Sequence, residues 1–391
     1  MRKRKFVMKQ EGTAFRLKPR HASGFLWKPL RGRGILTVFS YPQHLSPHFN
    51  PMILMHRILP QLSAALFAIL CLLAAGMLHA QTPGLVLQGK TGPLAGKHVV
   101  LVAADDEYRS EELIPQLAKI LAVHHGCQCT VLFAVDPQTG FIDPGAQNIP
   151  GLEALDSADL LVLFARFREL PDEQMKHFVD YFESGKPIVG LRTATHSFNY
   201  VRHKDSRYAK YSYNDAKFSG GFGRQVLGET WIDHYGQHNV ESTRATIVSG
   251  MEQHPIVRGV DPIWGPSDVY AIKTLTGDSQ PLLLGHVLTG MKPTDPVNEK
   301  KQPVPVAWTK TYTGAQGKPA RIFTTTMGHA GDLQCPNFRR LLVNACYWCM
   351  GLEDKIPARS KIDFVGKYEP NPIHNGGFKK NVKPSDFQLK D

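Results

Sequence analysis

The sequence predicts an α/β domain with a mainly parallel sheet that helices cover on both faces. Short apolar runs, of the kind that form buried strands, alternate along the chain with stretches whose apolar residues recur every three or four positions. Strands of a parallel sheet are buried on both faces, and therefore read as near-continuous apolar runs. The region with this pattern, residues 85–351, is long enough for one large domain.

The first half of this region alternates regularly between strands and helices. Leu113, Leu117 and Leu121 share one face of the first expected helix. The second helix has Pro171 and acidic residues in its first turn, and Gly185 ends it. The expected strands are 98–104, 130–135, 159–165 and 188–191, and the expected helices are 111–125 and 170–184.

The second half is less regular. A strand is expected over 321–326, followed by Gly328 and His329, and the last helix spans about 337–350. The chain after Gly351 is polar and rich in Pro, Gly and Lys, so we expect 352–391 to form an extended tail on the domain. The other expected strands, some of them an antiparallel addition, are 243–249, 268–273, 281–288 and 304–312.

An apolar stretch near the amino terminus has the layout of a secretory signal peptide. Residues 55–80 begin with the basic Arg57, continue through an apolar run, and end with the small residue Ala80 at a cut site. Cleavage after Ala80 would make the protein secreted or periplasmic. The alternative is an uncleaved amino-terminal anchor, the single expected link to a membrane.

Residues 1–54 are expected to be a spurious upstream extension, with translation starting at Met52 or Met55, or a disordered one. Most of the net positive charge lies in the first 57 residues. The first 57 residues hold 12 of the 46 Lys and Arg residues and one of the 34 Asp and Glu residues, so the rest of the chain has a net charge of +1. The formal net charge of +12 therefore gives no support for a nucleic-acid partner.

Five cysteines follow the predicted cleavage point, an odd number for a protein in an oxidising compartment. Cys346 and Cys349 have the Cys-x-x-Cys spacing of redox motifs. They lie late in a helical pattern rather than after a strand, which favours buried helix cysteines or a structural disulfide over a redox role.

Polar residues follow three of the expected strands, where ligands bind in open α/β sheets. They are Asp106, Glu107 and Tyr108 after the first strand, Arg192, Thr193 and His196 after the fourth, and His329 after the late strand. Each group also has a structural interpretation, because acidic residues after a strand often cap the next helix. Their convergence on one sheet edge favours a site.

A fourth cluster contains Trp231, His234, Tyr235 and His238. Aromatic faces stack on the C–H bonds of sugars while polar groups bind hydroxyls, so this composition suits a carbohydrate. His234 and His238 have the i,i+4 spacing of a metal site on a helix, but Gly236 between them argues against a helix. We therefore expect substrate contacts here, with a divalent metal as the alternative.

Six short segments, taken together in their order along the chain, carry a resemblance to a known family. They are 97–102, 187–198, 252–256, 306–309, 321–329 and 338–344. In this order they resemble the trehalose-utilisation (ThuA-like) family over about 95–350, and most of all its secreted branch. The resemblance implies a flavodoxin-like fold of the class I glutamine amidotransferase type, a three-layer sandwich around a mainly parallel sheet.

The resemblance also limits the chemistry. In glutamine amidotransferases a cysteine nucleophile stands where this chain has Arg192, and many ThuA-like proteins have His there. Without the thiol, glutamine hydrolysis through a thioester is not available. The family's association with disaccharide catabolism, beside sugar oxidoreductases, instead implies an enzyme with a small carbohydrate substrate such as a 3-keto-glycoside, and no required cofactor.

A ring ketone makes the adjacent proton acidic, so cleavage or isomerisation can pass through an enediolate. That route needs a general base and a cationic partner for the oxyanion. We expect Arg192 to be the cation and His329 or Glu107 the base. The expected substrate-binding residues are Asp106, Tyr108, Thr193, His196, Trp231, His234, Tyr235 and His238.

Two other functions remain open from the sequence. The missing nucleophile and the long tail are also typical of a binding or interaction domain without catalysis. A metal-dependent hydrolase would use His234, His238 and His329 as ligands.

Overall fold

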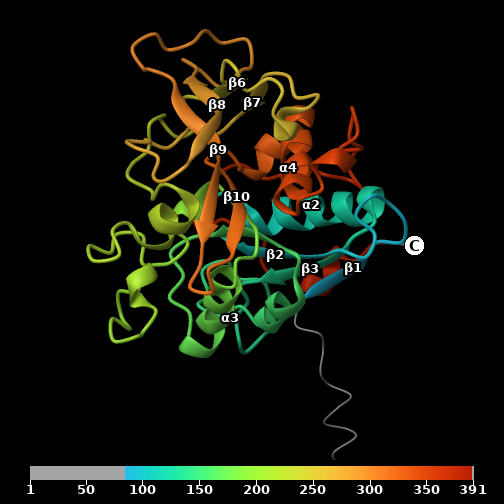
Figure 1. Cartoon of the computed structure of the whole chain (residues 1–391), viewed down its shortest axis with the longest axis vertical. Helices are drawn as coiled ribbons and strands as arrows, with labels where there is room; N and C mark the ends of the chain where they lie inside the picture. The colour runs from blue at the N-terminus through green and yellow to red at the C-terminus, as the bar shows by residue number, and fades with distance from the viewer. Residues whose placement is uncertain (1–83, 390–391) are drawn as a thin grey trace, which may run out of the picture. The chain divides into compact units, whose positions relative to one another are not determined.

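The computed structural model describes residues 84–389 (Figure 1). The predicted signal peptide, the alternative anchor and the upstream extension lie outside these residues. Within the described range, no helix combines the length and the apolar character needed to cross a membrane.

A mixed sheet of ten strands forms the centre of the domain, in the order β1-β3-β2-β4-β5-β10-β9-β8-β6-β7. The strands are β1 (Leu85–Gln88), β2 (His98–Ala104), β3 (Gln128–Phe133), β4 (Leu160–Ala165), β5 (Ile188–Leu191), β6 (Thr243–Ile247), β7 (Ile263–Gly265), β8 (Gln280–Val287), β9 (Val304–Thr313) and β10 (Pro319–Thr325).

One half of the sheet is parallel and the other half is antiparallel. Strands β3, β2, β4, β5 and β10 run parallel in an order that, among themselves, is 2-1-3-4-5, as in flavodoxin-like folds. The strands β9, β8, β6 and β7 continue from β10 with antiparallel pairings, and β1 pairs antiparallel with β3. The α/β class is therefore confirmed, but the prediction of a mainly parallel sheet is not.

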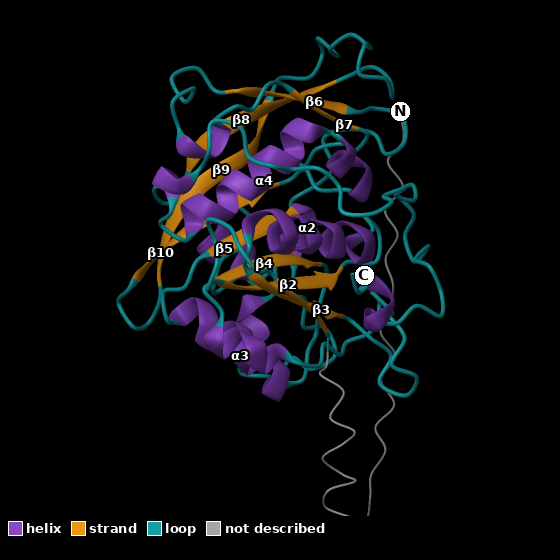
Figure 2. Ribbon diagram, turned by 90° about the vertical axis from the view of Figure 1, so that its right-hand side faces the viewer, coloured by secondary structure: helices purple, strands orange, loops and turns teal. Residues whose placement is uncertain are grey.

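Helices cover both faces of the parallel half (Figure 2). Along β2, Val99 and Leu101 pack into the apolar core that contains α2 (Ser110–His125) and α4 (Pro336–Cys349). Val100 and Val102 face the opposite core, which contains α3 (Asp172–Glu183). Because successive side chains of a strand point to opposite faces, one strand supplies both cores.

The predicted elements match the structure closely where the chain alternates regularly. The three helices and the strands β2, β3, β4 and β5 lie within two residues of the predicted bounds, and so do β6, β8, β9 and β10 in the less regular second half. The predicted strand 268–273 is wrong, because this segment forms only an isolated bridge between Tyr270 and His234. The short strands β1 and β7 were not predicted.

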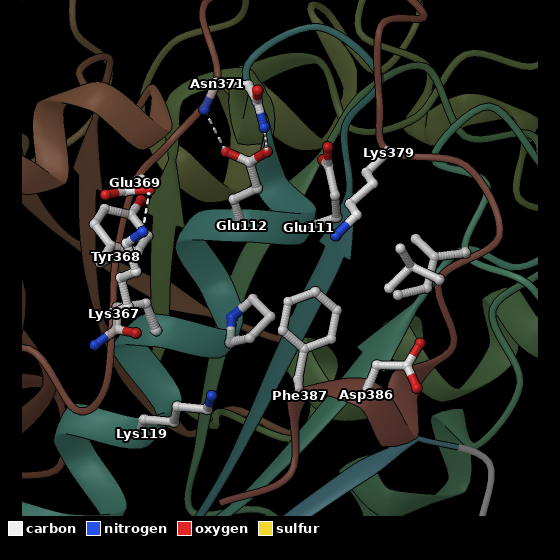
Figure 3. A pocket seen from close by; sticks show the side chains of 14 residues that line it. Glu111, Glu112, Lys119, Lys367, Tyr368, Glu369, Asn371, Lys379, Asp386 and Phe387 are labelled. Atoms are coloured by element: carbon white, nitrogen blue, oxygen red, sulfur yellow. Dashed lines mark hydrogen bonds and ion pairs between the residues drawn. The ribbon is translucent and has the colours of Figure 1, made fainter.

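As far as Leu389, the tail after Gly351 contains no strand or α-helix, and it runs beside α2 (Figure 3) and the loop after β2. The amide of Gly376 donates to the carbonyl of Asp106, 2.7 Å away, and the amide of His374 donates to that of Glu107. The tail therefore holds the loop that carries two of the predicted site residues.

Trp308 in β9 allows a direct test of the packing beneath this sheet. Its side chain is fully buried, and its indole Nε1 donates to the carbonyl of Leu227 at 2.7 Å. We expect Trp308→Phe to lower the free energy of unfolding by about 1–3 kcal/mol, through the lost hydrogen bond and the void left by the smaller ring. Urea denaturation measures this loss. The control is Trp264→Phe, which removes a half-buried indole bonded to Ser242, and an equal loss there would contradict the account.

Candidate functional site

The turn after β5 has the strained backbone of a strand-to-helix elbow. Strand β5 ends at Leu191, and Arg192 begins a short 3₁₀ turn with φ of 47°. A positive φ is uncommon for a residue with a side chain, and such strain is found at functional sites. Arg192, Thr193 and His196 therefore follow β5 directly, as the sequence predicted.

Arg192 does not point into an open site. Its side chain is fully buried, with Nη1 donating to the carbonyls of Asp268 and Thr326 at 2.5 and 2.8 Å. The rings of Tyr108 and Tyr270 lie on the guanidinium, with centroids 4.1 and 4.3 Å from Cζ. A substrate cannot reach this group. The expectation that Arg192 contacts an oxyanion directly therefore does not fit the structure.

Asp268 is the partner of Arg192 and the centre of the cluster. Arg192 Nη2 donates to Oδ1 of Asp268 at 2.5 Å, and both side chains are fully buried. Burial alone would raise the pKa of this carboxyl, but Arg192 and the hydrogen bonds from His234 and His238 outweigh burial and hold it well below the usual range. Asp268 therefore stays ionised beneath the two histidines.

His234 forms a dyad with Asp268. Its Nδ1 lies 2.7 Å from Oδ2 of Asp268, so Nδ1 carries the proton that it donates to the carboxylate. Within residues 84–389 no hydrogen bond engages Nε2, and about a third of the side chain is exposed. An imidazole oriented by a buried carboxylate, with its second nitrogen free, is the arrangement of a general base.

His238 is held between two carboxylates. Its Nε2 lies 3.1 Å from Oε1 of Glu107 and 3.1 Å from the hydroxyl of Tyr108, and its Nδ1 lies 3.1 Å from Oδ1 of Asp268. Hydrogen bonding to Asp268 and Glu107 raises the pKa of His238 to about 9. The charged imidazolium therefore stabilises the fold below its ordinary pKa of about 6.5, and this contribution is lost as the pH rises through 9.

The acidic loop after β2 is neutralised by a residue that the sequence did not single out. Arg166 donates to Asp106 at 2.9 Å and lies 3.0 Å from Glu107. Burial tends to raise the pKa of Glu107, but His238 and Arg166 lower it below its usual value. The neighbouring Asp105 has a structural role, because its Oδ1 accepts the amide hydrogens of Glu107 and Tyr108.

Aromatic rings form one side of the cluster. The ring centroid of Trp231 lies 5.9 Å from that of His234 and 6.4 Å from that of Phe167. His196 is buried beneath them, with its ring centroid 5.4 Å from that of Trp231 and 5.0 Å from that of Phe167. Burial lowers the pKa of His196 well below its ordinary value, so the imidazole is neutral. His196 and the fully buried Thr193 thus support the site without reaching its surface.

His329 lies at the end of β10, as predicted, but its side chain is buried and used locally. Its Nδ1 accepts the amide hydrogen of Gly331 at the start of a 3₁₀ turn. Burial lowers the pKa of His329 to about 4. Of the two expected bases, Glu107 joins the cluster, whereas within the described residues no hydrogen bond, ion pair or ring contact links His329 to His234 or His238.

Tyr235, in the loop that bears the two histidines, is partly buried and packs against the core. Its carbonyl accepts a hydrogen bond from Lys301 Nζ, which also lies over the tyrosine ring. This packing fixes the loop that carries His234 and His238. The structure thereby gives Tyr235 a supporting position.

Three ligand groups of this cluster lie close enough together to hold a metal ion. Atoms of His234, His238 and Asp268 lie within 4.8 Å of one another, although the loop is not helical. Gly236 correctly indicated the absence of a helix, but a loop brings the two rings to a centroid distance of 4.3 Å. The charge of Asp268 is already balanced by Arg192, which weakens its attraction for a dication.

Residues 144–349 match the family model described as trehalose utilisation, ThuA. The chain belongs to this family. Two similar solved structures are putative ThuA-like proteins, from Bacteroides uniformis (16% identity, 66% of this chain and 92% of that one, TM-score 0.42) and Parabacteroides merdae (14%, 65% and 90%, 0.41). A third is a cytoplasmic protein from Salmonella typhimurium LT2 (11%, 66% and 98%, 0.33). No curated protein matches the chain.

Substitution of Arg192 tests how much its ion pair with Asp268 stabilises this ThuA-family protein. We expect Arg192→Met to lower the free energy of unfolding by about 3 kcal/mol or more, because it leaves Asp268 buried without its strongest partner. Urea denaturation at pH 7 measures the change. Arg207→Met is the control, since it removes an exposed arginine 3.6 Å from Asp172, and we expect at most about 1 kcal/mol there. Equal losses would contradict a special role for Arg192.

Proposed function

We propose that this protein is an exported enzyme that cleaves or isomerises a carbohydrate derivative by general acid/base chemistry. The observation that supports this most is the pair of partly exposed histidines on one buried, ionised aspartate. A 3-keto-glycoside is the substrate class that suits the pair, because its chemistry needs one group to take a proton and another to stabilise negative charge. Trp231 and Phe167 supply apolar faces for the sugar ring.

His234 acts as the general base in this proposal. Its free Nε2 removes the proton from the carbon beside the ketone, and Asp268 stabilises the imidazolium that results. Asp268 can do this because Arg192 keeps it ionised. Arg192 is therefore a positioning residue. Instead of binding the substrate, as the sequence suggested, it holds the carboxylate of Asp268 in place.

His238 supplies the positive charge. Both of its ring nitrogens lie beside carboxylates, so as an imidazolium at neutral pH it would stabilise the developing enediolate through its charge rather than through a direct hydrogen bond. The electron pair of the broken C–H bond becomes the enediolate. In cleavage, that pair then forms a carbon–carbon double bond, the glycosidic C–O bond breaks, and the departing oxygen takes back the proton that Nε2 of His234 removed.

The proposal also implies which reaction supplies the substrate and in which compartment the enzyme acts. A 3-keto-glycoside is the product of a sugar oxidation, so a sugar oxidoreductase would supply this substrate. The predicted signal peptide would put the enzyme in the periplasm or outside the cell, and the proposal then requires the 3-keto-glycoside to be present in that compartment.

A second candidate, a metal-dependent hydrolase, is supported by the three potential ligands His234, His238 and Asp268. A bound divalent ion would supply a Lewis acid or an activated water there. The two mechanisms differ in their response to a chelator.

Turnover of 3-keto-glycosides by the purified mature protein tests the proposal. We expect His234→Ala to lower kcat at least about 100-fold, as for loss of a general base, with His203→Ala, an exposed histidine elsewhere, as the unchanged control. Wild-type activity should fall as the pH rises through about 9, where His238 loses its proton. Full activity of His234→Ala would contradict the assigned base.

The same assay separates the alternatives. Undiminished turnover in EDTA is expected for general acid/base chemistry, whereas its loss and recovery with a divalent ion would favour the hydrolase. Saturable sugar binding without turnover of any candidate would favour a non-catalytic carbohydrate-binding domain.

A further inference from the structure

Arg166 lies between the acidic loop after β2 and the aromatic side of the site. It is the first residue after β4, and its amide donates to the carbonyl of Ala104 at the end of β2, 3.0 Å away. Its Nη1 donates to Oδ1 of Asp106 at 2.9 Å, and its Nη2 lies 3.0 Å from Oε2 of Glu107. Its Cζ lies over the ring of Phe167, 4.8 Å from the centroid. One guanidinium therefore contacts both sides of the site.

Glu107 links this guanidinium to His238. Oε2 of Glu107 pairs with Arg166, while Oε1 lies 3.1 Å from Nε2 of His238. The two oxygens belong to one rigid carboxylate, so an ion pair at the first oxygen also fixes the direction of the second. Asp106 and Glu107 are adjacent acidic residues, and the positive charge of Arg166 offsets their mutual repulsion. Arg166 thus holds the carboxylate that lies beside His238.

Phe167 links the same guanidinium to the aromatic rings. The backbone of Phe167 has a φ of 51°, which is uncommon for a residue with a bulky side chain and persists only where the surroundings hold it. Its amide donates to the carbonyl of His196 at 2.9 Å. Its ring centroid lies 5.0 Å from that of His196, 5.2 Å from that of Tyr213 and 6.4 Å from that of Trp231. Phe167 is therefore held by its packing and by Arg166.

We propose that Arg166 is a positioning residue of this site, which holds both Glu107 beside His238 and the ring of Phe167 in the sugar-binding face. The inference rests on the proposed function, because it concerns the same site. Arginine suits this position, since its planar fork can bond two carboxylates while its flat face lies on an aromatic ring. Loss of the side chain would disturb both the charge that stabilises the enediolate and the face that binds the sugar.

The kinetic constants of Arg166→Met with 3-keto-glycosides test this role. We expect kcat to fall at least about tenfold, because a displaced charge stabilises the transition state poorly. KM should rise about threefold, because Phe167 loses the guanidinium on its ring. A smaller fraction of folded enzyme would lower the apparent kcat but leave KM unchanged. Unchanged values of both constants would overturn the proposal.

Arg207→Met is the matched control. Arg207 also lies over the aromatic ring of the next residue, with Cζ 4.8 Å from the centroid of Tyr208, but its carboxylate partner is Asp172 of α3, outside the site. Both kinetic constants should stay at their wild-type values in this variant. Equal effects of the two substitutions would contradict a special role for Arg166.

Arg166→Lys separates positioning from charge alone. Lysine keeps the positive charge but has neither the planar fork nor the flat face of arginine. We expect this variant to recover only part of the kcat that Arg166→Met loses, and none of the change in KM. Full recovery of both constants would overturn the proposal in favour of simple charge neutralisation.

Hydrogen exchange tests the positioning role without a substrate. The amides of Glu107 and Tyr108 donate to Asp105, and we expect their exchange to become at least about tenfold faster in Arg166→Met but not in Arg207→Met. Unchanged exchange in Arg166→Met would overturn the proposal even if the enzyme turns over 3-keto-glycosides. Faster exchange in a protein that turns over none of them would support the role of Arg166 and count against the proposed function instead.

Discussion

The ion pair between Arg192 and Asp268 is the interaction on which the site depends. It is fully buried, and two tyrosine rings cover the guanidinium. A charge in such a place is tolerated only with a partner in good geometry. The pair leaves one carboxylate oxygen for His234 and brings the other within 3.1 Å of His238, so a charge in the core fixes two side chains at the surface. The turn after β5 thus supplies the buried charge that orients the two histidines of the site.

The fold explains how distant segments reach this pair. The parallel half of the sheet brings the ends of β2, β4, β5 and β10 to one edge, where Glu107, Arg166 and Arg192 follow their strands. The loops before β6 and after β7 add the histidines and Asp268 from the antiparallel half. The tail then binds the loop of Asp106 and Glu107 through its backbone. The site is therefore assembled at the junction of the two halves, which explains why its polar groups come from so many segments.

The regular alternation of apolar runs was enough to predict the helices and most strands, because burial on both faces leaves a strong pattern. The short strands β1 and β7 lie at the two edges of the sheet and are not buried at every position, so they lack the continuous apolar run that made the equally short, fully buried β5 predictable. The site was predicted less well. The histidine loop and Glu107 were found from residue type and position, but Arg192 was assigned to a substrate because a sequence does not show whether a charge is buried. Asp268 stands 76 residues from Arg192, and no local signal links them.

The most direct test of this account is the titration of His238 by NMR, with its imidazole signals assigned through His238→Gln. If Asp268 and Glu107 hold the imidazolium, His238 should keep its proton up to a pH of about 9. In Asp268→Asn the midpoint should move down towards the ordinary value of about 6.5. A midpoint near 6.5 in the wild-type protein, or one that Asp268→Asn leaves unchanged, would contradict the claim that the buried carboxylate controls the charge of the site.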